Sequence, residues 1–525
     1  MDQSISSLIN MLEASLEREK QKDQQLAELQ KKLNELLSQL AWFKRKMFGS
    51  ISEKYPNITP LPGLFAELSD QIDSLSDSKA SEQELEQVVI QKKVKPRNPR
   101  LESMEGLPVV ESVIEPNDID FTKYKRIGEE HTKVIEFEPG KLFVLDIVRP
   151  KYALINQSNI DGDMPVIVIA PMPLLPIYKG SAGSTLIAEL LLQKYVHHLP
   201  FYRQTKQFKE LGLKLSATTI NDWFASSCDL IKPLYEKIRA RVLSSNYLQA
   251  DETTLPVINR EKKKADKEYL WMARAVKEKL LFFDYRDGSR SAKVVCEIFK
   301  DFKGTLQTDG YCAYEIFDKD PSVTLINCWA HCRRNYEASL VENKTLAQYA
   351  LGQIQLLYKL ERVFKDKQYS PVQIEAERQR LALPIIRDLE NWIEQNYKTV
   401  LPKSRIGKAM SYNYSRIQRL SRYIYDGNLQ IDNNPAENAI RPVTVSRKNF
   451  LFCGNHNAAS NAAMIFTLTG CCREQNINTR HYLIDVLNQL PYILDKKESI
   501  DSLMPDKWIE QHPESLLRPD PSKMD

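Results

Sequence analysis

Cysteine is absent from the first 227 residues of this 525-residue chain, and the later cysteines include no Cys-x-x-Cys pair. A small secreted protein that depends on disulfides carries paired cysteines along its length, so a disulfide framework is excluded. We therefore expect the protein to work in a reducing cytoplasm. The eight cysteines are Cys228, Cys296, Cys312, Cys328, Cys332, Cys453, Cys471 and Cys472.

The sequence also lacks segments that would direct it to a membrane. Its first ten residues, MDQSISSLIN, have neither the basic nor the apolar region of a signal peptide. The most apolar run, MPVIVIAPMPLLPI, is interrupted by prolines and is too short to span a bilayer. No G-x-x-x-x-G-K-S/T loop occurs, so nucleotide hydrolysis is not indicated. We expect no membrane partner.

The overall composition is that of an ordinary globular protein, with 42% hydrophobic and 27% charged residues. A chain of this length is too long for a single core, so we expect about three to five structural units. The net charge of +4 is too small to identify a partner. Local clusters of basic residues carry more information.

Residues 1–50 show the heptad spacing of a coiled coil. Their later leucines follow one another at alternating steps of three and four, which places them along one seam. We expect this segment to join copies of the chain into a homo-oligomer; the alternative is an amphipathic helix that packs on the protein's own body. Residues 51–100 are polar, contain several prolines and end in QKKVKPRNPR, which is typical of a linker.

Two smaller modules are predicted after the linker. Within residues 101–165, the runs TKVIEFE and KLFVLDIV alternate in polarity around Pro139-Gly140, which predicts a small β-hairpin module. Residues 166–245 have helical periodicity. Here the segment FYRQTKQFKELG ends at Gly212, and Ser216 is placed to cap a second helix. The pair resembles a helix-turn-helix; DNA contact and plain packing between helices are the two interpretations.

Residues 246–338 change to a pattern of strands. Three strand-like runs are followed by one helix and two more strands, an order that predicts an RNase H-like α/β core. Residues 339–425 are helical in pattern and form a predicted insertion, and residues 426–490 return to the core. Residues 491–525 are interpreted as a C-terminal tail. The predicted fold class is therefore a multidomain α+β protein. The five runs are YLQAD, EYLWMARA, KLLFFDYR, GTLQTD and TLINCWA.

Three acidic residues lie where such a core would place a catalytic site. Asp251 ends the first strand, Asp309 follows the fourth, and Glu437 opens a helix after the insertion. In an RNase H-like sheet the first and fourth strands are neighbours, so Asp251 and Asp309 converge. Glu437 closes the site if the insertion leaves and re-enters the same core.

Crowded carboxylates repel one another, and hard divalent cations such as Mg²⁺ relieve the repulsion. We expect a two-Mg²⁺ site for in-line phosphoryl transfer, with Mn²⁺ as a substitute.

Each acid also has a purely structural interpretation. Asp309 precedes a glycine, and Asp-Gly is a common turn. Glu437 stands three residues after Asn434, which is the spacing of a capping box. Two neighbours compete for the ligand role, since Glu252 adjoins Asp251, and Asp432 lies near Glu437.

Basic residues crowd the same segments. Such side chains would hold phosphates beside a metal site, although ordinary surface charge is the alternative. His331 would contact phosphate or water. The Cys328–His331–Cys332 spacing lacks a second ligand pair nearby, so we expect no zinc site there. The basic candidates are Arg333, Arg334, Arg441, Arg447 and Lys448.

Several long blocks resemble, in order, those of the insertion-sequence-66 family of bacterial transposases. The blocks are FKRKMFGSISEKY, HHLPFYRQTKQFKELGLKLSATTINDWF, YLQADETTLPV, LQTDGYCAYE, NCWAHCRRNYEAS, NNPAENAIRPVTVSRKNFLFCGN and MPDKW. The resemblance implies a DDE-class enzyme with Asp251, Asp309 and Glu437 as its triad. It also implies terminal inverted repeats and target sites in double-stranded DNA as partners, accessory proteins of the same element, and a place with the nucleoid in a bacterial cytoplasm.

One departure from the family pattern concerns metal binding outside the core. The family usually carries a zinc-binding module with two cysteine pairs between the coil and the core. Residues 101–165 occupy that place and contain no cysteine, so we expect no zinc there. Two rival functions remain: a catalytically inactive relic that binds DNA or assembles, and an RNase H-like nuclease without strand transfer.

Overall fold

The computed structural model describes residues 180–517, apart from 260, 287 and 288, and short stretches between residues 140 and 178. The predicted coiled coil (1–50) and linker (51–100) lie outside the described residues. The chain divides into two compact units, of which the smaller comprises Lys79–Met172. Within the described residues, no helix is both long and apolar enough to cross a membrane.

The described part of the smaller unit contains one antiparallel strand pair. Strand β1 (Lys151–Ala153) pairs with β2 (Ile167–Ile169). The predicted run TKVIEFE lies outside the described residues, and residues 142–145, in the predicted strand KLFVLDIV, form no strand. Their apolar side chains are exposed, as in Val144 at 92%, and so have no apolar layer to pack against. The observed pair lies further along the chain, and β2 lies beyond the predicted boundary at residue 165.

Three helices precede the sheet of the larger unit, as the apolar spacing predicted: α3 (Ser184–Tyr195), α4 (Phe201–Glu210) and α5 (Ala217–Leu243). The turn after α4 uses Gly212 at a φ of +89°, a conformation that glycine adopts without strain. The Ser216 side chain caps α5 by accepting a hydrogen bond from the Thr219 N–H at 3.0 Å. Helix α5 runs to Leu243, within the range predicted to be helical, because its apolar stripe continues to Val242.

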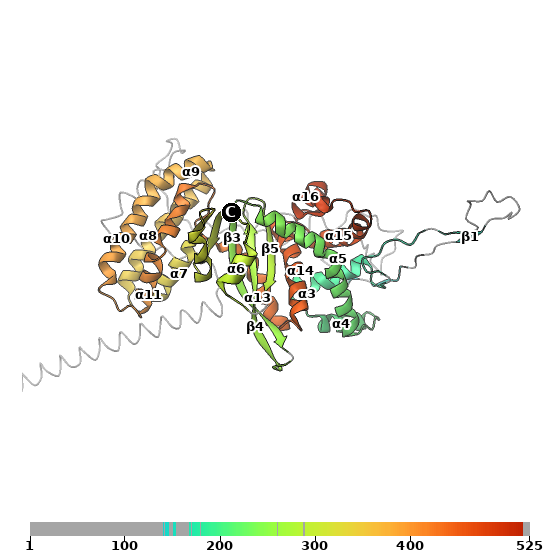
Figure 1. Ribbon diagram of the computed structural model, residues 1–525. Helices are drawn as coiled ribbons and strands as arrows, with labels where there is room; N and C mark the ends of the chain where they lie inside the picture. The colour runs from blue at the N-terminus through green and yellow to red at the C-terminus, as the bar shows by residue number, and fades with distance from the viewer. Residues whose placement is uncertain are drawn as a thin grey trace, which may run out of the picture. The chain divides into compact units, whose positions relative to one another are not determined.

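A five-stranded mixed sheet forms the centre of this unit (Figure 1). Its order is β5-β4-β3-β6-β7. The first three strands are an antiparallel meander, and β6 and β7 run parallel to β3. The first and fourth strands are therefore neighbours, as predicted. The strands are β3 (Tyr247–Asn259), β4 (Lys264–Ala275), β5 (Leu280–Arg286), β6 (Gly304–Thr308) and β7 (Val323–Asn327).

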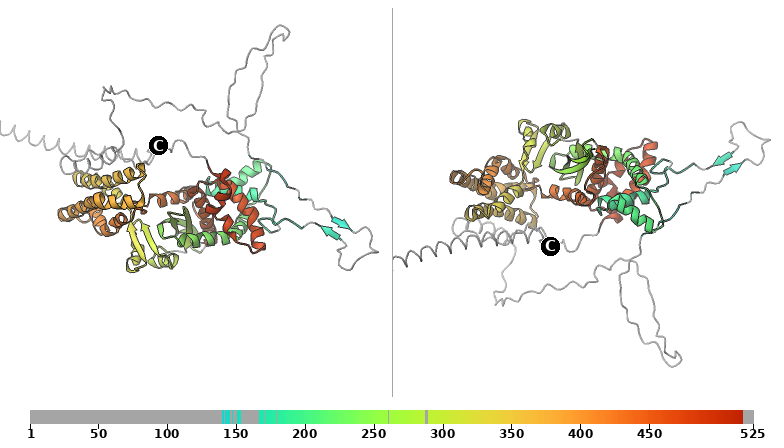
Figure 2. Two further views of the ribbon diagram at one scale, coloured as in Figure 1. Left: turned by 90° about the horizontal axis from the view of Figure 1, so that it is seen from above. Right: turned by 90° about the horizontal axis from the view of Figure 1, so that it is seen from below.

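Two short helical segments connect the strands, and a helical insertion follows them. Helix α6 (Ala292–Ile298) precedes β6, and η3 (Cys312–Lys319) joins β6 to β7. Figure 2 shows the insertion helices gathered at one side of the sheet, and α3, α5 and α14 at the other. The insertion comprises α7 (Trp329–Ser339), α8 (Lys344–Asp366), α9 (Pro371–Glu377), η4 (Arg378–Ala382), α10 (Leu383–Tyr397), α11 (Arg405–Tyr414), α12 (Ile417–Ser421) and η5 (Arg422–Tyr425).

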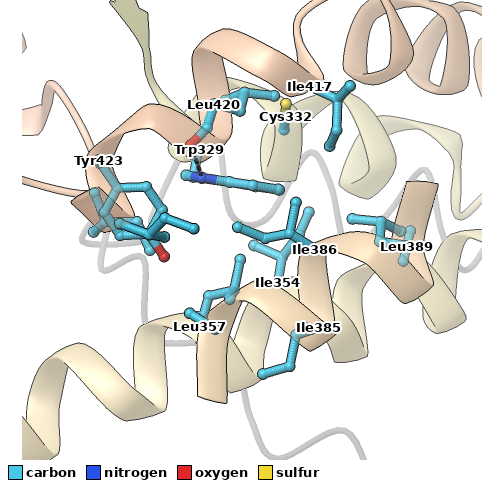
Figure 3. Packing of buried hydrophobic residues seen from close by; sticks show 14 of the residues in the cluster. Trp329, Cys332, Ile354, Leu357, Ile385, Ile386, Leu389, Ile417, Leu420 and Tyr423 are labelled. Atoms are coloured by element: carbon cyan, nitrogen blue, oxygen red, sulfur yellow. Dashed lines mark hydrogen bonds between the residues drawn. The ribbon is translucent and has the colours of Figure 1, made fainter. Parts of the chain in front are cut away.

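The insertion has a hydrophobic core of its own (Figure 3). Trp329 is fully buried at its centre, beside Ile354, Leu357 and Ile386. The indole N–H of Trp329 donates to the Leu420 carbonyl at 2.9 Å. Because Trp329 begins α7 directly after β7, this core is fixed to the edge of the sheet.

After the insertion, the chain returns to the sheet at a cluster of three hydrogen-bonded glutamines. The Gln249 and Gln307 side chains, on neighbouring strands, bond to each other at 2.8 Å. Gln430 then joins both, because its side chain accepts from Gln249 at 2.9 Å and its carbonyl accepts from Gln307 at 2.8 Å. The insertion therefore leaves and returns to one core, as predicted. The returning helices are α13 (Asn434–Phe450) and α14 (His456–Glu474), and α14 packs on β5.

Residues 491–517 are packed on the larger unit, which corrects, over that range, the interpretation of residues 491–525 as a tail. Helix α15 (Thr479–Asp495) passes the predicted boundary, and it is followed by η6 (Ile500–Leu503), α16 (Pro505–Gln511) and η7 (Pro513–Ser515). Trp508 is 2% exposed, and its indole N–H donates to the Asp485 carboxylate at 2.6 Å. The buried tryptophan thus helps to fix a segment whose composition is mostly polar.

Candidate active site

The sheet register brings the first two predicted acids together. In the parallel pair β3–β6, Gln249 lies opposite Gln307. Asp309 stands two residues after Gln307, just past the end of β6, and its carboxylate acts electrostatically on Asp251. Alternate residues of a strand share a face, so Asp251 lies on the face on which Gln249 meets Gln307.

Asp251 is held in a poorly solvated and negatively charged environment. Burial raises its pKa well above the ordinary value, and the carboxylates of Glu252, Asp309 and Glu437 raise it further. One hydrogen bond acts in the opposite direction, because the Glu252 N–H donates to Asp251 Oδ1 at 2.8 Å. Acids from β3, from the end of β6 and from α13 therefore interact. Such a group of oxygen ligands fits a divalent cation, because the cation offsets a charge that burial disfavours.

Glu252, the competitor of Asp251, is committed to a separate ion pair. Its side chain is 1% exposed and accepts hydrogen bonds from the Arg290 guanidinium, with the Nε contact at 2.8 Å. The Tyr314 hydroxyl donates to the other carboxylate oxygen at 3.1 Å. Both oxygens of Glu252 thus have partners within the fold, which favours Asp251 as the ligand.

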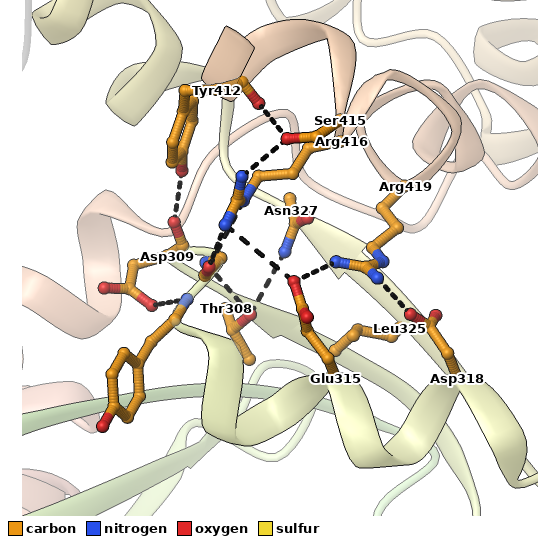
Figure 4. A network of polar contacts seen from close by, with 12 residues as sticks. Thr308, Asp309, Glu315, Asp318, Leu325, Asn327, Tyr412, Ser415, Arg416 and Arg419 are labelled. Carbon is orange, nitrogen blue, oxygen red and sulfur yellow. Dashed lines mark hydrogen bonds and ion pairs between the residues drawn. The ribbon is translucent and has the colours of Figure 1, made fainter. Parts of the chain in front are cut away.

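The sequence offered two interpretations of Asp309, a turn residue before glycine or an acid of the site, and the structure is compatible with both at once. Its Oδ1 accepts from the Tyr311 N–H at 2.8 Å, and Gly310 between them has a φ of +87°. The carbonyl of Asp309 accepts a hydrogen bond from the Tyr412 hydroxyl of the insertion (Figure 4). A carboxylate with one oxygen in a turn keeps its second oxygen for another ligand.

Glu437 reaches the site because the start of α13 is bonded to β3. The Asn433 side chain donates to the Ala250 carbonyl at 3.0 Å, and the Gln249 side chain donates to the Asp432 carbonyl at 3.2 Å. The Glu437 carboxylate accepts two hydrogen bonds from Arg334, at 2.7 and 2.8 Å. The Glu437 side chain therefore forms an ion pair with Arg334 of α7. The capping-box interpretation instead predicts a hydrogen bond from the Glu437 side chain to the backbone of its own helix.

Asp432, the competitor of Glu437, has structural partners. Its Oδ2 accepts from the Tyr358 hydroxyl at 3.0 Å, and its Oδ1 accepts from the Asn434 N–H at 3.1 Å. These contacts join the insertion to the first turn of α13. They favour Glu437 as the acid that faces Asp251.

The predicted phosphate-binding residues occupy different environments. Arg334 lies at the acids, through its pair with Glu437. Arg333 is 15% exposed in its side chain and pairs with Glu337 at 3.9 Å on the same helix. Arg447 donates to the carbonyl and the hydroxyl of Thr254, so it fastens α13 to β3. Arg441 and Lys448 are exposed.

A second group of metal-ligand type adjoins Glu437. The ligand atoms of Cys328, His331 and Glu437 all lie within 4.8 Å of one another. Burial raises the pKa of the Cys328 thiol to about 12, and its sulfur accepts a hydrogen bond from the Asn433 N–H at 3.2 Å. Zinc binds thiolate, so burial opposes this set as a zinc site. His331, at 3.6 Å from Glu437, lies beside the acids, as its predicted role requires.

Comparison with known proteins assigns the chain to a family. Residues 179–461 match the model of the transposase IS66 family. An uncharacterized protein of Sinorhizobium fredii, y4qI, is 30% identical over 75% of this chain and 75% of its own length. A second from the same organism, y4jD, is 25% identical over 94% of this chain and 98% of its own. The matched range runs from α3 into α14 and so includes the sheet, the insertion and the three acids. The chain belongs to the IS66 family of transposases.

Proposed function

We propose that this transposase is a DDE-class enzyme with an RNase H-like core, in which Asp251, Asp309 and Glu437 hold a pair of Mg²⁺ ions. The observation that carries the proposal is the convergence of Asp309 and Glu437 on Asp251: after burial and Glu252, both carboxylates contribute to raising its pKa. The parallel β3–β6 pair and the return of α13 to β3 bring this about. Mn²⁺ is expected to substitute, since it takes the same oxygen ligands.

The reaction is phosphodiester hydrolysis followed by strand transfer. In the first step water forms a bond to phosphorus and the P–O3′ bond breaks, which frees a 3′-hydroxyl. In the second step that hydroxyl forms a bond to a target phosphorus, and the target 3′-oxygen leaves. Bound Mg²⁺ would stabilise the entering and leaving oxygens by Lewis-acid catalysis. The three carboxylates hold and orient the site, and no covalent protein nucleophile is required.

Arg334 has two tasks under this proposal. Without metal its guanidinium neutralises Glu437 through a bidentate pair. When Glu437 serves as a metal ligand, the same guanidinium is released to bind a DNA phosphate. His331 is placed to contact phosphate or water from the same helix.

The outer face of α4 is proposed as a DNA contact. Its buried face consists of Phe201, Gln204 and Phe208. On the opposite side Tyr202 is 55% exposed, and Arg203 and Lys206 lie over its ring, with Arg203 Cζ at 5.7 Å and Lys206 Nζ at 5.9 Å from the centroid. Basic side chains on an exposed helix beside a glycine turn suit the phosphates of a duplex.

Three further features of the proposal rest on the sequence. The heptads of residues 1–50 would make the active form a homo-oligomer that pairs two element ends. Accessory proteins of the same element would take part. The reaction would take place with the nucleoid in the bacterial cytoplasm, where the DNA partner lies.

The test of the catalytic triad is cleavage of a labelled element end in Mg²⁺, Mn²⁺ or chelator. The Asp251→Ala, Asp309→Ala and Glu437→Ala variants are expected to lose cleavage and to keep end binding. Full cleavage by any one of them contradicts that residue's assignment. Asp301→Ala, an exposed acid outside the site, is the matched control.

Two rival functions are separated by the same reagents. A catalytically inactive relic would bind ends and give no Mg²⁺-dependent product. A nuclease without strand transfer would cut and then fail to join pre-cut ends to a target. Joining of pre-cut ends by the wild-type protein supports the transposase.

A further inference from the structure

The backbone of Asp309 is not held by the sheet. The β3–β6 ladder ends at the pair Gln249–Gln307, and the β6–β7 ladder ends at Thr308–Asn327. Asp251, by contrast, lies inside the β3–β4 ladder opposite Met272. Strand pairing therefore fixes the backbone of Asp251. The backbone of Asp309, which follows the end of β6, needs a different support.

Two residues of the insertion supply that support (Figure 4). The Tyr412 hydroxyl, on α11, donates to the Asp309 carbonyl. The Arg416 guanidinium donates to the next carbonyl, that of Gly310, from Nε at 3.3 Å and from Nη2 at 3.0 Å. The two consecutive carbonyls of the turn that carries Asp309 are thus hydrogen-bonded by two neighbouring residues of the insertion. These residues lie more than 100 positions later in the sequence.

The Arg416 side chain is itself oriented by its surroundings. Its Cζ lies 4.3 Å from the centre of the Tyr412 ring, and its Nη1 donates to Ser415 Oγ at 2.8 Å. Glu315, in η3, lies 3.9 Å from Nη2 and also accepts from Arg419 at 3.0 Å. The guanidinium is therefore held against the turn by a stacked ring, a hydroxyl and a carboxylate.

The turn is shaped to accept this close approach. A Cβ atom at Gly310 would lie 2.7 Å from Arg416 Nε and 3.0 Å from the Tyr412 hydroxyl, so a larger residue would displace both. The φ of +87° at Gly310 adds a second reason for glycine. The turn and the two insertion residues therefore form one fitted unit.

We infer that Tyr412 and Arg416 are positioning residues for Asp309. By fixing two consecutive carbonyls, they hold the Asp309 carboxylate toward Asp251, so that the helical insertion sets the metal affinity of the catalytic site. The consequence for Mg²⁺ rests on the proposed function. The consequence for the turn itself does not.

The test compares Tyr412→Phe with Tyr414→Phe. Tyr414 lies on the same helix, is 47% exposed and donates only outward to Glu394, so it is a matched control. Loss of one hydrogen bond typically corresponds to about a fivefold change in an equilibrium constant. We expect Tyr412→Phe to raise the Mg²⁺ concentration for half-maximal cleavage about fivefold, with a smaller loss of rate at saturating Mg²⁺. Tyr414→Phe should leave both unchanged.

Arg416 provides the conservative series. Arg416→Ala should raise the Mg²⁺ requirement, and Arg416→Lys, which keeps one cationic donor, should recover part of the loss. A thermal midpoint like that of wild type shows that the insertion remains folded. Equal Mg²⁺ requirements in Tyr412→Phe, Tyr414→Phe and wild type would overturn the inference.

A metal-free measurement keeps this inference separate from the proposed function. Hydrogen–deuterium exchange of peptides that cover residues 305–317 should be faster in Tyr412→Phe than in Tyr414→Phe, because the turn has lost its anchor. If the wild type never cuts DNA, the proposed function fails, and the exchange experiment still decides the inference. Unchanged exchange in Tyr412→Phe refutes the positioning role whatever the cleavage result.

Discussion

At the residue scale, adjacent acids have opposite tasks. Asp251 meets the other two acids of the site, and its pKa is raised by burial first and by its acidic neighbours second. Glu252 pairs with Arg290 and Tyr314, while burial and then the Asp309 carboxylate raise its pKa. Consecutive side chains of a strand point to opposite faces, which gives the two acids different hydrogen-bond partners. One acid is thus left to the candidate site, and its neighbour is bonded within the fold.

The raised pKa of Asp251 predicts a gain in stability when its charge is removed. Folding favours the protonated form, so the stabilising contribution is present at low pH and is lost as pH rises through the folded-state pKa. At a pH above the folded-state pKa of Asp251, Asp251→Asn should therefore raise the metal-free midpoint of thermal unfolding, by about 2–4 °C for each 1 kcal/mol. The gain should shrink as the pH falls below the folded-state pKa, because the wild type is then protonated as well.

Calorimetry with and without Mg²⁺ measures this effect. The wild type should gain stability on addition of Mg²⁺, and Asp251→Asn should gain little. Asp301→Asn, at an exposed position, should behave as the wild type in both conditions. A metal-free midpoint for Asp251→Asn that stays below that of the wild type across the pH range would contradict the electrostatic account.

Arg447 and Lys448 are neighbours that should separate stability from DNA binding. Arg447 fastens α13 to Thr254, so Arg447→Ala leaves polar groups of β3 without their partner and should cost about 1–3 kcal/mol of unfolding free energy. Lys448 is exposed, so Lys448→Ala should leave stability unchanged and weaken DNA binding. Urea unfolding and binding to a labelled end measure the two effects. Equal stability losses in both variants would contradict this division.

At the element scale, α4 is predicted to contribute phosphate contacts. The double variant Arg203→Ala/Lys206→Ala should weaken end binding and reduce the slope of log affinity against log salt by about 2. Lys398→Ala/Lys403→Ala removes the same charge from exposed positions of the insertion and is the control. An unchanged slope in the α4 variant would show that this face is not a DNA contact.

Local patterns predicted most elements of the larger unit. Helical spacing predicted α3 to α5, and the alternation of strands with one helix predicted β3 to β7 and α6 in the correct order. The segments that lead to Asp251 and Asp309 also share the pattern Leu-Gln-x-Asp, and the register pairs Leu248 with Leu306 and Gln249 with Gln307. This repeated pattern would have predicted the buried glutamine contact, which the analysis of the acids alone missed.

Contacts between distant segments were beyond sequence reasoning. The pair Arg334–Glu437 joins residues 103 positions apart, and nothing local to α13 indicates it. In the sequence, Tyr412 has the pattern of an ordinary aromatic residue of an amphipathic helix. Only the structure shows that its hydroxyl donates a hydrogen bond to the Asp309 carbonyl. The packing around α16 uses a few buried side chains, Leu503, Met504 and Trp508, in a mostly polar segment. In each case individual side chains reach across the fold, and periodicity carries no signal for them.

At the scale of the whole molecule, oligomer formation is predicted to depend on residues 1–50. A chain without them should sediment as a monomer, and it should bind single ends without forming complexes that contain two ends. Sedimentation velocity and gel mobility measure these properties. An oligomer of unchanged size in the truncated chain would locate the self-association elsewhere.

The central claim is that Asp251, Asp309 and Glu437 hold one divalent-metal site. Anomalous diffraction from a crystal of the protein grown with Mn²⁺ tests it most directly. We expect Mn²⁺ bound by carboxylate oxygens of all three residues, with Arg334 displaced from Glu437. Mn²⁺ bound away from these acids, or Glu437 still paired with Arg334 while Mn²⁺ occupies Asp251 and Asp309, would contradict the claim.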